Sequence, residues 1–88
     1  MDLDAKPLQY FIAVARDNSF SRAAARLNVS QPSLSAQIRE LERRLGFPLF
    51  DRSSRRVSLS REGTLFLPQA HQMVAEAART NRVAREIR

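Results

Sequence analysis

Two stretches of the chain gather side chains that can hydrogen-bond to nucleic acid. The first stretch supplies Ser30, Gln31, Ser33, Ser35 and Arg39, and the second supplies Arg52, Ser53, Arg55 and Arg56. A glutamine amide can pair with adenine, and a serine hydroxyl can meet a base edge or a phosphate. Guanidinium groups suit phosphates or a narrow minor groove. These residue types predict a polyanion-binding surface if the fold brings the two stretches together.

The net charge favours the same kind of partner. Fifteen Lys and Arg against nine Asp and Glu give +6 over 88 residues. An excess of this size on a short chain is typical of proteins that bind a polyanion, most often nucleic acid. A solvated surface in an arginine-rich proteome is the alternative, and the order of elements along the chain has to decide between them.

Composition argues against several other functions. The chain has no cysteine, two glycines and one histidine, His71, so a disulfide scaffold, thiol catalysis, a glycine-rich phosphate loop and a metal cluster are not expected. No apolar run approaches the ~20 residues of a membrane span, and the acidic start at residues 1–4 does not resemble a signal peptide. We expect one mainly helical, cytoplasmic domain without cofactor or metal.

The elements that must position the polar residues begin with two helices. Leu8, Phe11, Ile12 and Ala15 recur at i, i+3, i+4 and i+7, which predicts a helix from about Pro7 to Arg16. A turn over 17–19 leads to a short second helix, capped by Ser19 or Ser21. Its inner face would consist of Ala23, Ala24 and Leu27. Asn28 tolerates the left-handed conformation of a tight turn.

A third helix carries the first polar stretch. Ser30 would cap it, and the predicted helix runs from Gln31 to about Leu45, with Gly46 as its C-terminal cap. Its apolar stripe consists of Leu34, Ile38, Leu41 and Leu45. At 100° per residue the opposite side carries Pro32, Ser33, Ala36, Arg39 and Arg43, with Ser35 on the flank. The small polar start of this face suits a major groove about 12 Å wide.

The second polar stretch lies on a predicted hairpin. Leu49–Phe50 and Val57–Leu59 would form its strands, within residues 49–59, around a turn rich in arginine. Helix, short helix, tight turn, third helix and hairpin follow one another in the order of a winged helix-turn-helix. We therefore predict a mainly α fold of that type over residues 1–60, with the helix-turn-helix at about 19–39.

A last helix is predicted from Arg61 to the end of the chain. Capped by Ser60, it would have up to 28 residues, or ~42 Å, and Pro68 should bend it. Its apolar positions step by four and three without interruption: Phe66, Ala70, Met73, Ala77, Thr80, Ala84 and Ile87. Such a row is typical of a helix that packs on another long helix. Because the chain offers no such partner, residues 61–88 are predicted to form a linker and dimerisation helix.

Several stretches resemble one known family. They are residues 11–15 (FIAVA), 19–27 (SFSRAAARL), 29–35 (VSQPSLS), 41–46 (LERRLG), 49–52 (LFDR) and 59–63 (LSREG). In this order they closely resemble the N-terminal domain of the LysR-type transcriptional regulators, and the resemblance covers roughly Leu8 to Met73.

The resemblance implies a winged helix-turn-helix whose linker helix pairs antiparallel with that of a second subunit. It implies double-stranded DNA as partner, in interrupted inverted repeats. It also implies a tetramer at full length and a small-molecule effector on a C-terminal domain absent from this chain. Carried over by position, recognition contacts fall on Ser30, Gln31, Pro32, Ser33 and Ser35, and wing contacts on Arg52, Ser53 and Arg55. Our predicted interface adds Ser21, Ala36, Arg39 and Arg56. At the position of Ala36 many members carry arginine. Because alanine cannot make that contact, we expect Gln31, Ser33 and Arg39 to make more of the contacts to DNA.

Four other interpretations are less favoured. Another winged helix, such as that of the molybdate-responsive regulator, shares the layout but not the motifs at 30–33 and 49–52. A helical protein-interaction module would bind DNA weakly and without regard to sequence. A membrane-surface peptide could use the basic residues of 79–88, but alanines dominate their apolar side. An enzyme is not expected, because His71 has no carboxylate or nucleophile at helical spacing.

Overall fold

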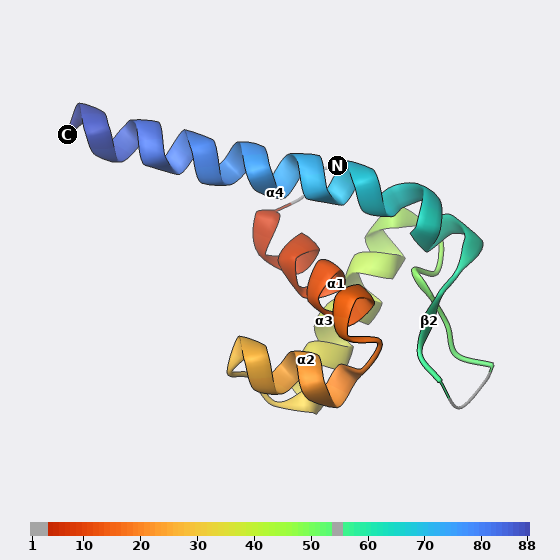
Figure 1. The fold of residues 1–88 in the computed structure, drawn as a ribbon. Helices are drawn as coiled ribbons and strands as arrows, with labels where there is room; N and C mark the ends of the chain where they lie inside the picture. Colours follow the sequence, from red (N-terminus) through yellow and green to blue (C-terminus); the bar gives the residue numbers. More distant parts are fainter. Residues whose placement is uncertain (1–3, 54–55) are drawn as a thin grey trace.

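The computed structural model describes residues 4–53 and 56–88, which form four helices and a two-stranded hairpin. The elements are α1 (Ala5–Asp17), α2 (Phe20–Leu27), α3 (Gln31–Leu45), β1 (Phe50–Asp51), β2 (Ser58–Leu59) and α4 (Arg61–Ile87). In Figure 1, α1 lies between α4 and α2, α3 passes behind α1, and α4 projects well beyond the body of the domain. The predicted architecture of three helices, a wing and a long helix is confirmed.

Helix boundaries follow from local chemistry that the sequence predicts well. Serine side chains accept a hydrogen bond from the first turn of α2, α3 and α4, at Ser19, Ser30 and Ser60. Ser19, and not Ser21, is therefore the cap of α2, which frees the Ser21 hydroxyl for another contact. Asn28 (φ 60°) and Gly46 (φ 84°) take the left-handed conformation that ends α2 and α3.

The core is centred on α1, which packs against α2, α3 and α4. Its buried face is wider than the predicted stripe, because Tyr10, Ala13 and Val14 are buried as well, while Ile12 and Ala15 of the stripe are only half-buried. A helix covered from three sides buries more than one row of side chains. The fully buried large side chains are Phe11, Leu8, Leu34, Ile38, Leu49 and Val14.

Aromatic rings join the hairpin and α4 to this core. Phe11 meets Phe50 edge-on at a centroid distance of 5.6 Å and stacks on Phe66 at 6.2 Å. Phe47 reaches Phe66 edge-on at 5.8 Å. Such pairs add about 0.5–1.5 kcal/mol each beyond their buried area, so they fix where the hairpin and the first turns of α4 lie.

The predicted strands need a one-residue correction. β1 and β2 are antiparallel, with Phe50 opposite Leu59 and Asp51 opposite Ser58. Leu49 and Val57 lie outside the strands. The Leu49 N–H donates instead to the Glu42 carboxylate, and its carbonyl accepts from the Ser60 N–H at 3.0 Å. Residues 54 and 55 lie outside the described residues.

The prediction that α4 finds no partner within the chain is wrong for its first half. Ala70 is fully buried, and Phe66 is half-buried against the core. These two residues were expected to contact a second chain, but the core of the same chain already covers Ala70 and packs against Phe66. Beyond them Val74 and Ala77 are half-buried, and the rest of α4 is exposed, with Met73 at 38%, Val83 at 41% and Ile87 at 80%. Pro68 lies inside α4, which continues through it as one helix.

Candidate nucleic-acid interface

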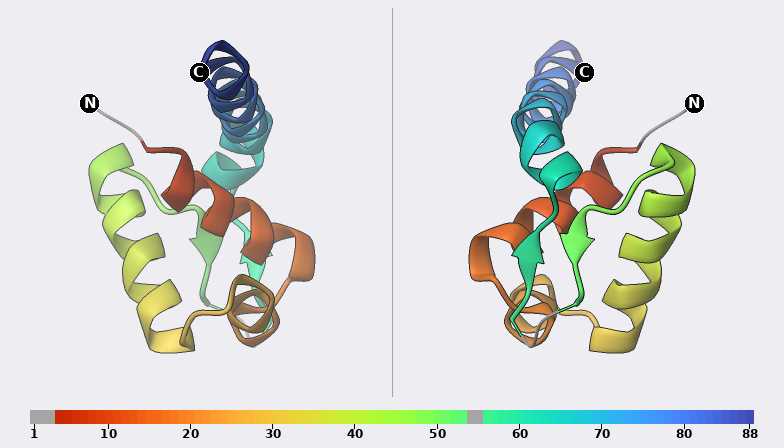
Figure 2. Two further views of the ribbon diagram at one scale, coloured as in Figure 1. Left: turned by 90° about the vertical axis from the view of Figure 1, so that its left-hand side faces the viewer. Right: turned by 90° about the vertical axis from the view of Figure 1, so that its right-hand side faces the viewer.

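One end of the domain carries the predicted contact residues. Figure 2 places α2, the N-terminal end of α3 and the free end of the hairpin together, opposite the C-terminus of α4. Leu34, Ile38 and Leu41 turn the other side of α3 into the core. The side that remains open carries exposed Gln31, Pro32, Ser33, Ala36 and Arg39, with Ser35 half-buried.

Small side chains allow α2 and α3 to pack closely. Ala23 and Ala24 of α2 are buried in the core that also holds Leu34. The turn between the helices is closed by the Val29 N–H, which donates to the Ala24 carbonyl at 3.0 Å. This packing brings Ser21 next to Gln31, where the Ser21 hydroxyl donates to Gln31 Oε1 at 3.0 Å. Sequence reasoning did not anticipate that contact, because it joins residues of two different helices.

Ser30 is the cap of α3, as predicted, and its hydroxyl oxygen accepts from the Ser33 N–H at 3.2 Å. The capping interaction uses the oxygen and leaves the hydroxyl proton for a further acceptor. The N-terminus of α3 therefore faces outward with a hydroxyl donor and the positive end of the helix dipole. Both features suit a phosphate group.

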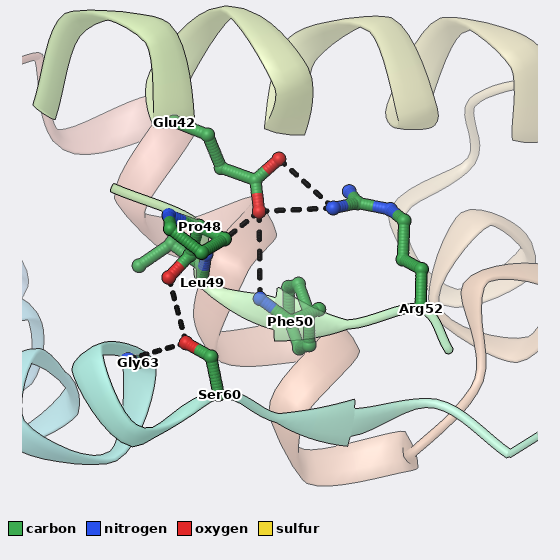
Figure 3. A network of polar contacts seen from close by, with 7 residues as sticks. All are labelled: Glu42, Pro48, Leu49, Phe50, Arg52, Ser60 and Gly63. Carbon is green, nitrogen blue, oxygen red and sulfur yellow. Dashed lines mark hydrogen bonds and ion pairs between the residues drawn. The ribbon is translucent and has the colours of Figure 1, made fainter. Parts of the chain in front are cut away.

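Glu42 fastens the hairpin to α3. Its side chain is 12% exposed, and its carboxylate accepts from the backbone N–H of Leu49 at 2.7 Å and more weakly from that of Phe50 at 3.4 Å. Both carboxylate oxygens lie 3.0 Å from Arg52 Nη1, as Figure 3 shows. The Arg52 guanidinium also lies 5.9 Å from the ring centroid of Phe20. Sequence reasoning gave Glu42 no role and did not anticipate this internal partner for Arg52.

Ser60 and Gly63 hold the other side of the hairpin to α4. The Ser60 hydroxyl donates to the Pro48 carbonyl at 2.6 Å and accepts from the Gly63 N–H at 2.8 Å (Figure 3). A Cβ on Gly63 would lie 2.1 Å from the Leu49 carbonyl oxygen. Only glycine permits this close approach, so the hairpin takes a fixed position relative to α3 and α4.

The described part of the wing has its own turn chemistry. The backbone N–H and hydroxyl of Ser53 both donate to Asp51 Oδ1, at 2.9 and 2.6 Å. These hydrogen bonds lower the pKa of Asp51 below its ordinary value. Ser53 was predicted as a DNA contact, and here it shapes the turn. Arg55, predicted in the same role, lies outside the described residues.

A shallow depression between α3 and the hairpin carries three arginines. It is lined by Phe20, Ser35, Arg39, Asp51, Arg52, Arg56 and Val57. Its volume of about 220 Å³ is below the 300–1,000 Å³ typical of small-molecule pockets. The two predicted polar stretches thus meet here, and the site suits a polyanion crossing the surface better than an enclosed ligand.

Farther along α3 the charges are paired internally. Arg43, predicted on the outward face, donates to the Glu40 carboxylate at 2.6 and 3.0 Å, and Arg44 lies 3.5 Å from it. The Arg43 hydrogen bond lowers the pKa of Glu40. Within the part of the chain that the structure describes, no three His, Asp or Glu side chains converge on a possible metal position.

These features define a winged helix-turn-helix domain: a capped recognition helix on a short second helix, and an arginine-bearing hairpin fastened beside it. The model of the bacterial regulatory helix-turn-helix proteins of the lysR family matches residues 6–64. The chain belongs to this family, as the sequence motifs predicted.

Curated relatives are transcriptional regulators. The chain is 42% identical over 85 residues to a probable cat1 operon transcriptional activator of Acinetobacter lwoffii. It is 44% identical over 85 residues to the Hca operon transcriptional activator HcaR of Escherichia coli. Each match covers 97% of this chain but only 28% and 29% of the relative. The chain therefore spans less than a third of the length of these relatives.

Solved structures confirm the fold. The BenM_DBD complex with catB site 1 DNA superposes with a TM-score of 0.88 at 35% identity, covering 97% of this chain and 96% of that one. Vibrio fischeri DarR in complex with DNA gives 0.94 at 33% identity, covering 99% and 30%. Among the described residues, no helix combines the length and apolar character needed to cross a bilayer.

Proposed function

We propose that this chain is the N-terminal DNA-binding domain of a cytoplasmic transcriptional regulator that reads double-stranded DNA by sequence. One observation carries the proposal: the start of α3 and the hairpin lie at the same end of the domain (Figure 2), and arginines of both elements line the depression between them. A recognition helix in the major groove places the hairpin over the adjacent backbone or minor groove. The charge of +6 favours that encounter.

The open face of α3 divides into base-reading and backbone-contacting parts. We assign base edges to Gln31, Ser33 and Ser35, because these exposed or half-exposed polar groups lie in the first two turns. Pro32 and Ala36 offer apolar contact, which suits a thymine methyl group. Arg39 and Arg56 line the depression beside the hairpin, and we assign them, with Arg55 by sequence, to phosphates.

Arg52 is assigned a supporting role. Its guanidinium is ion-paired to Glu42 and lies over Phe20, so a phosphate would have to compete with a carboxylate for the same donors. We infer that Arg52 fixes the angle between the hairpin and α3, and that Arg39 supplies more of the backbone contact.

We further propose that two copies pair through the second half of α4. Met73, Ala77, Thr80, Ala84 and Ile87 continue the apolar row beyond the part that the core covers, and most of this row is exposed. A second α4 lying antiparallel would cover it and relate two recognition helices by a two-fold axis. Paired half-sites in inverted repeat are the matching DNA. A tetramer and an effector site belong to the proposal only for a longer, full-length protein.

The test is fluorescence anisotropy with the intergenic DNA upstream of the gene against a scrambled duplex, over a salt series. Specific binding predicts an affinity ratio of about 10³ or more. Equal, steeply salt-dependent binding to both duplexes would contradict sequence-specific reading of that DNA. Absence of binding to either at low salt would refute the DNA proposal and favour a protein-interaction module built on α4.

A further inference from the structure

Ser21 and Gln31 share a hydrogen bond on the face that we assign to the major groove. Ser21 lies in the first turn of α2, and Gln31 is the first residue of α3. The Ser21 hydroxyl donates to Gln31 Oε1 at 3.0 Å, and both residues are exposed. The contact therefore orients the glutamine amide in the protein alone.

The orientation matters because a glutamine amide can read a base in more than one way. To read adenine it uses both of its ends, accepting from N6 and donating to N7. Here the carbonyl oxygen accepts from Ser21, which occupies one of its two lone pairs and holds that end of the amide toward α2. The nitrogen end keeps its two N–H donors. An amide held in this way matches a base edge that offers acceptors only, and guanine offers two, N7 and O6.

The Ser21 hydroxyl is available for this task because a neighbour caps α2. The hydroxyl oxygen of Ser19 accepts from the Arg22 N–H at 3.1 Å. Close packing through buried Ala23 and Ala24 holds α2 against α3, so Ser21 stays within reach of Gln31. At residue 36 the face offers only the methyl group of Ala36, which leaves Gln31 as the principal long side chain at the start of α3.

We infer that Ser21 is a positioning residue that sets base specificity through Gln31. It holds Gln31 as a donor, so that the base facing Gln31 is guanine in preference to adenine. The inference rests on the proposed function, since it requires α3 in the major groove. The bias is moderate, because a net contribution typical of one neutral hydrogen bond shifts an equilibrium about two- to ten-fold.

The experiment is selection from a library of random double-stranded DNA, sequenced after binding to the wild-type chain and to four variants. Gln31→Ala identifies the base position that Gln31 faces, because that position alone should lose its preference. At this position the wild type and Ser21→Thr, which keeps the hydroxyl, should enrich guanine over adenine. In Ser21→Ala the ratio should move toward adenine by about two- to ten-fold. Ser19→Ala is the control: it removes the α2 cap, lowers the melting temperature and leaves the base profile unchanged.

Three outcomes would overturn the inference. The wild type could enrich adenine at the Gln31 position, or Ser21→Ala could weaken binding with an unchanged base profile. Gln31→Ala could also leave every position unchanged. Each of these contradicts the role of Ser21 while the enriched site still supports sequence-specific DNA binding. A library from which the wild type enriches no sequence would instead overturn the proposed function and the inference together.

Discussion

Replacement of Glu42 by glutamine should destabilise the domain by about 2 kcal/mol, although the two side chains have nearly the same shape. A hydrogen bond to a charged group contributes about 1.5–3 kcal/mol and a neutral one about 1. The 2.7 Å bond from Leu49 therefore loses about 1 kcal/mol, and the 3.4 Å bond from Phe50 loses little. The Arg52 side chain is 37% exposed, so its ion pair adds only about 0.5–1 kcal/mol.

The assay is thermal unfolding followed by circular dichroism at one fixed protein concentration, because association would make the midpoint concentration-dependent. A loss of about 2 kcal/mol corresponds to a fall in Tm of about 8–16 °C for a domain of this size. The fall should persist at high salt, since the carboxylate is largely buried and poorly screened. Glu40→Gln is the matched control: Glu40 lies on the same helix, but its side chain is 48% exposed, so the Tm of this variant should fall much less than that of Glu42→Gln. Equal Tm values for Glu42→Gln and the wild type would refute the role given to Glu42.

Four further predictions test the site and the packing. Gly63→Ala should lower the free energy of unfolding by about 1–3 kcal/mol or more, because the new Cβ would lie 2.1 Å from the Leu49 carbonyl oxygen. Urea unfolding measures this loss, and an unchanged midpoint would contradict the close approach. Gln31→Ala should weaken the binding free energy for the preferred duplex by about 1–3 kcal/mol and reduce the base preference at one position of the site. An equal loss of affinity for all duplexes would argue against base reading. Arg39→Gln should weaken binding to every duplex and lower the salt slope by about 1, and an unchanged slope would remove Arg39 from the backbone contacts. Ala77→Asp should dissociate the dimer in sedimentation experiments and weaken paired half-sites more than single ones, while Ala78→Asp, at an exposed position of α4, should not; a monomeric wild type at micromolar concentration would refute pairing through α4.

The sequence alone determined the helices, because helix formation depends on neighbours within one turn. Ser30 and Ser60 cap helices through N–H groups three residues away. Asn28 and Gly46 end helices through their own backbone conformations. The outward face of α3 follows in the same way from its buried stripe. These short-range signals, together with the family motifs, were sufficient to identify a winged helix-turn-helix of the lysR family.

Only the tertiary structure decided which element covers which surface. The apolar row of α4 has one period from Phe66 to Ile87, yet the core of the domain buries Ala70 and leaves Ile87 exposed. The partners of Arg52 and Gln31 likewise lie ten residues away, on Glu42 and Ser21. Periodicity predicts the face of a helix on which a side chain lies, and residue type indicates which groups that side chain can bind. Contacts between distant segments depend on how the whole chain packs. Local sequence patterns therefore do not show which distant residues will meet.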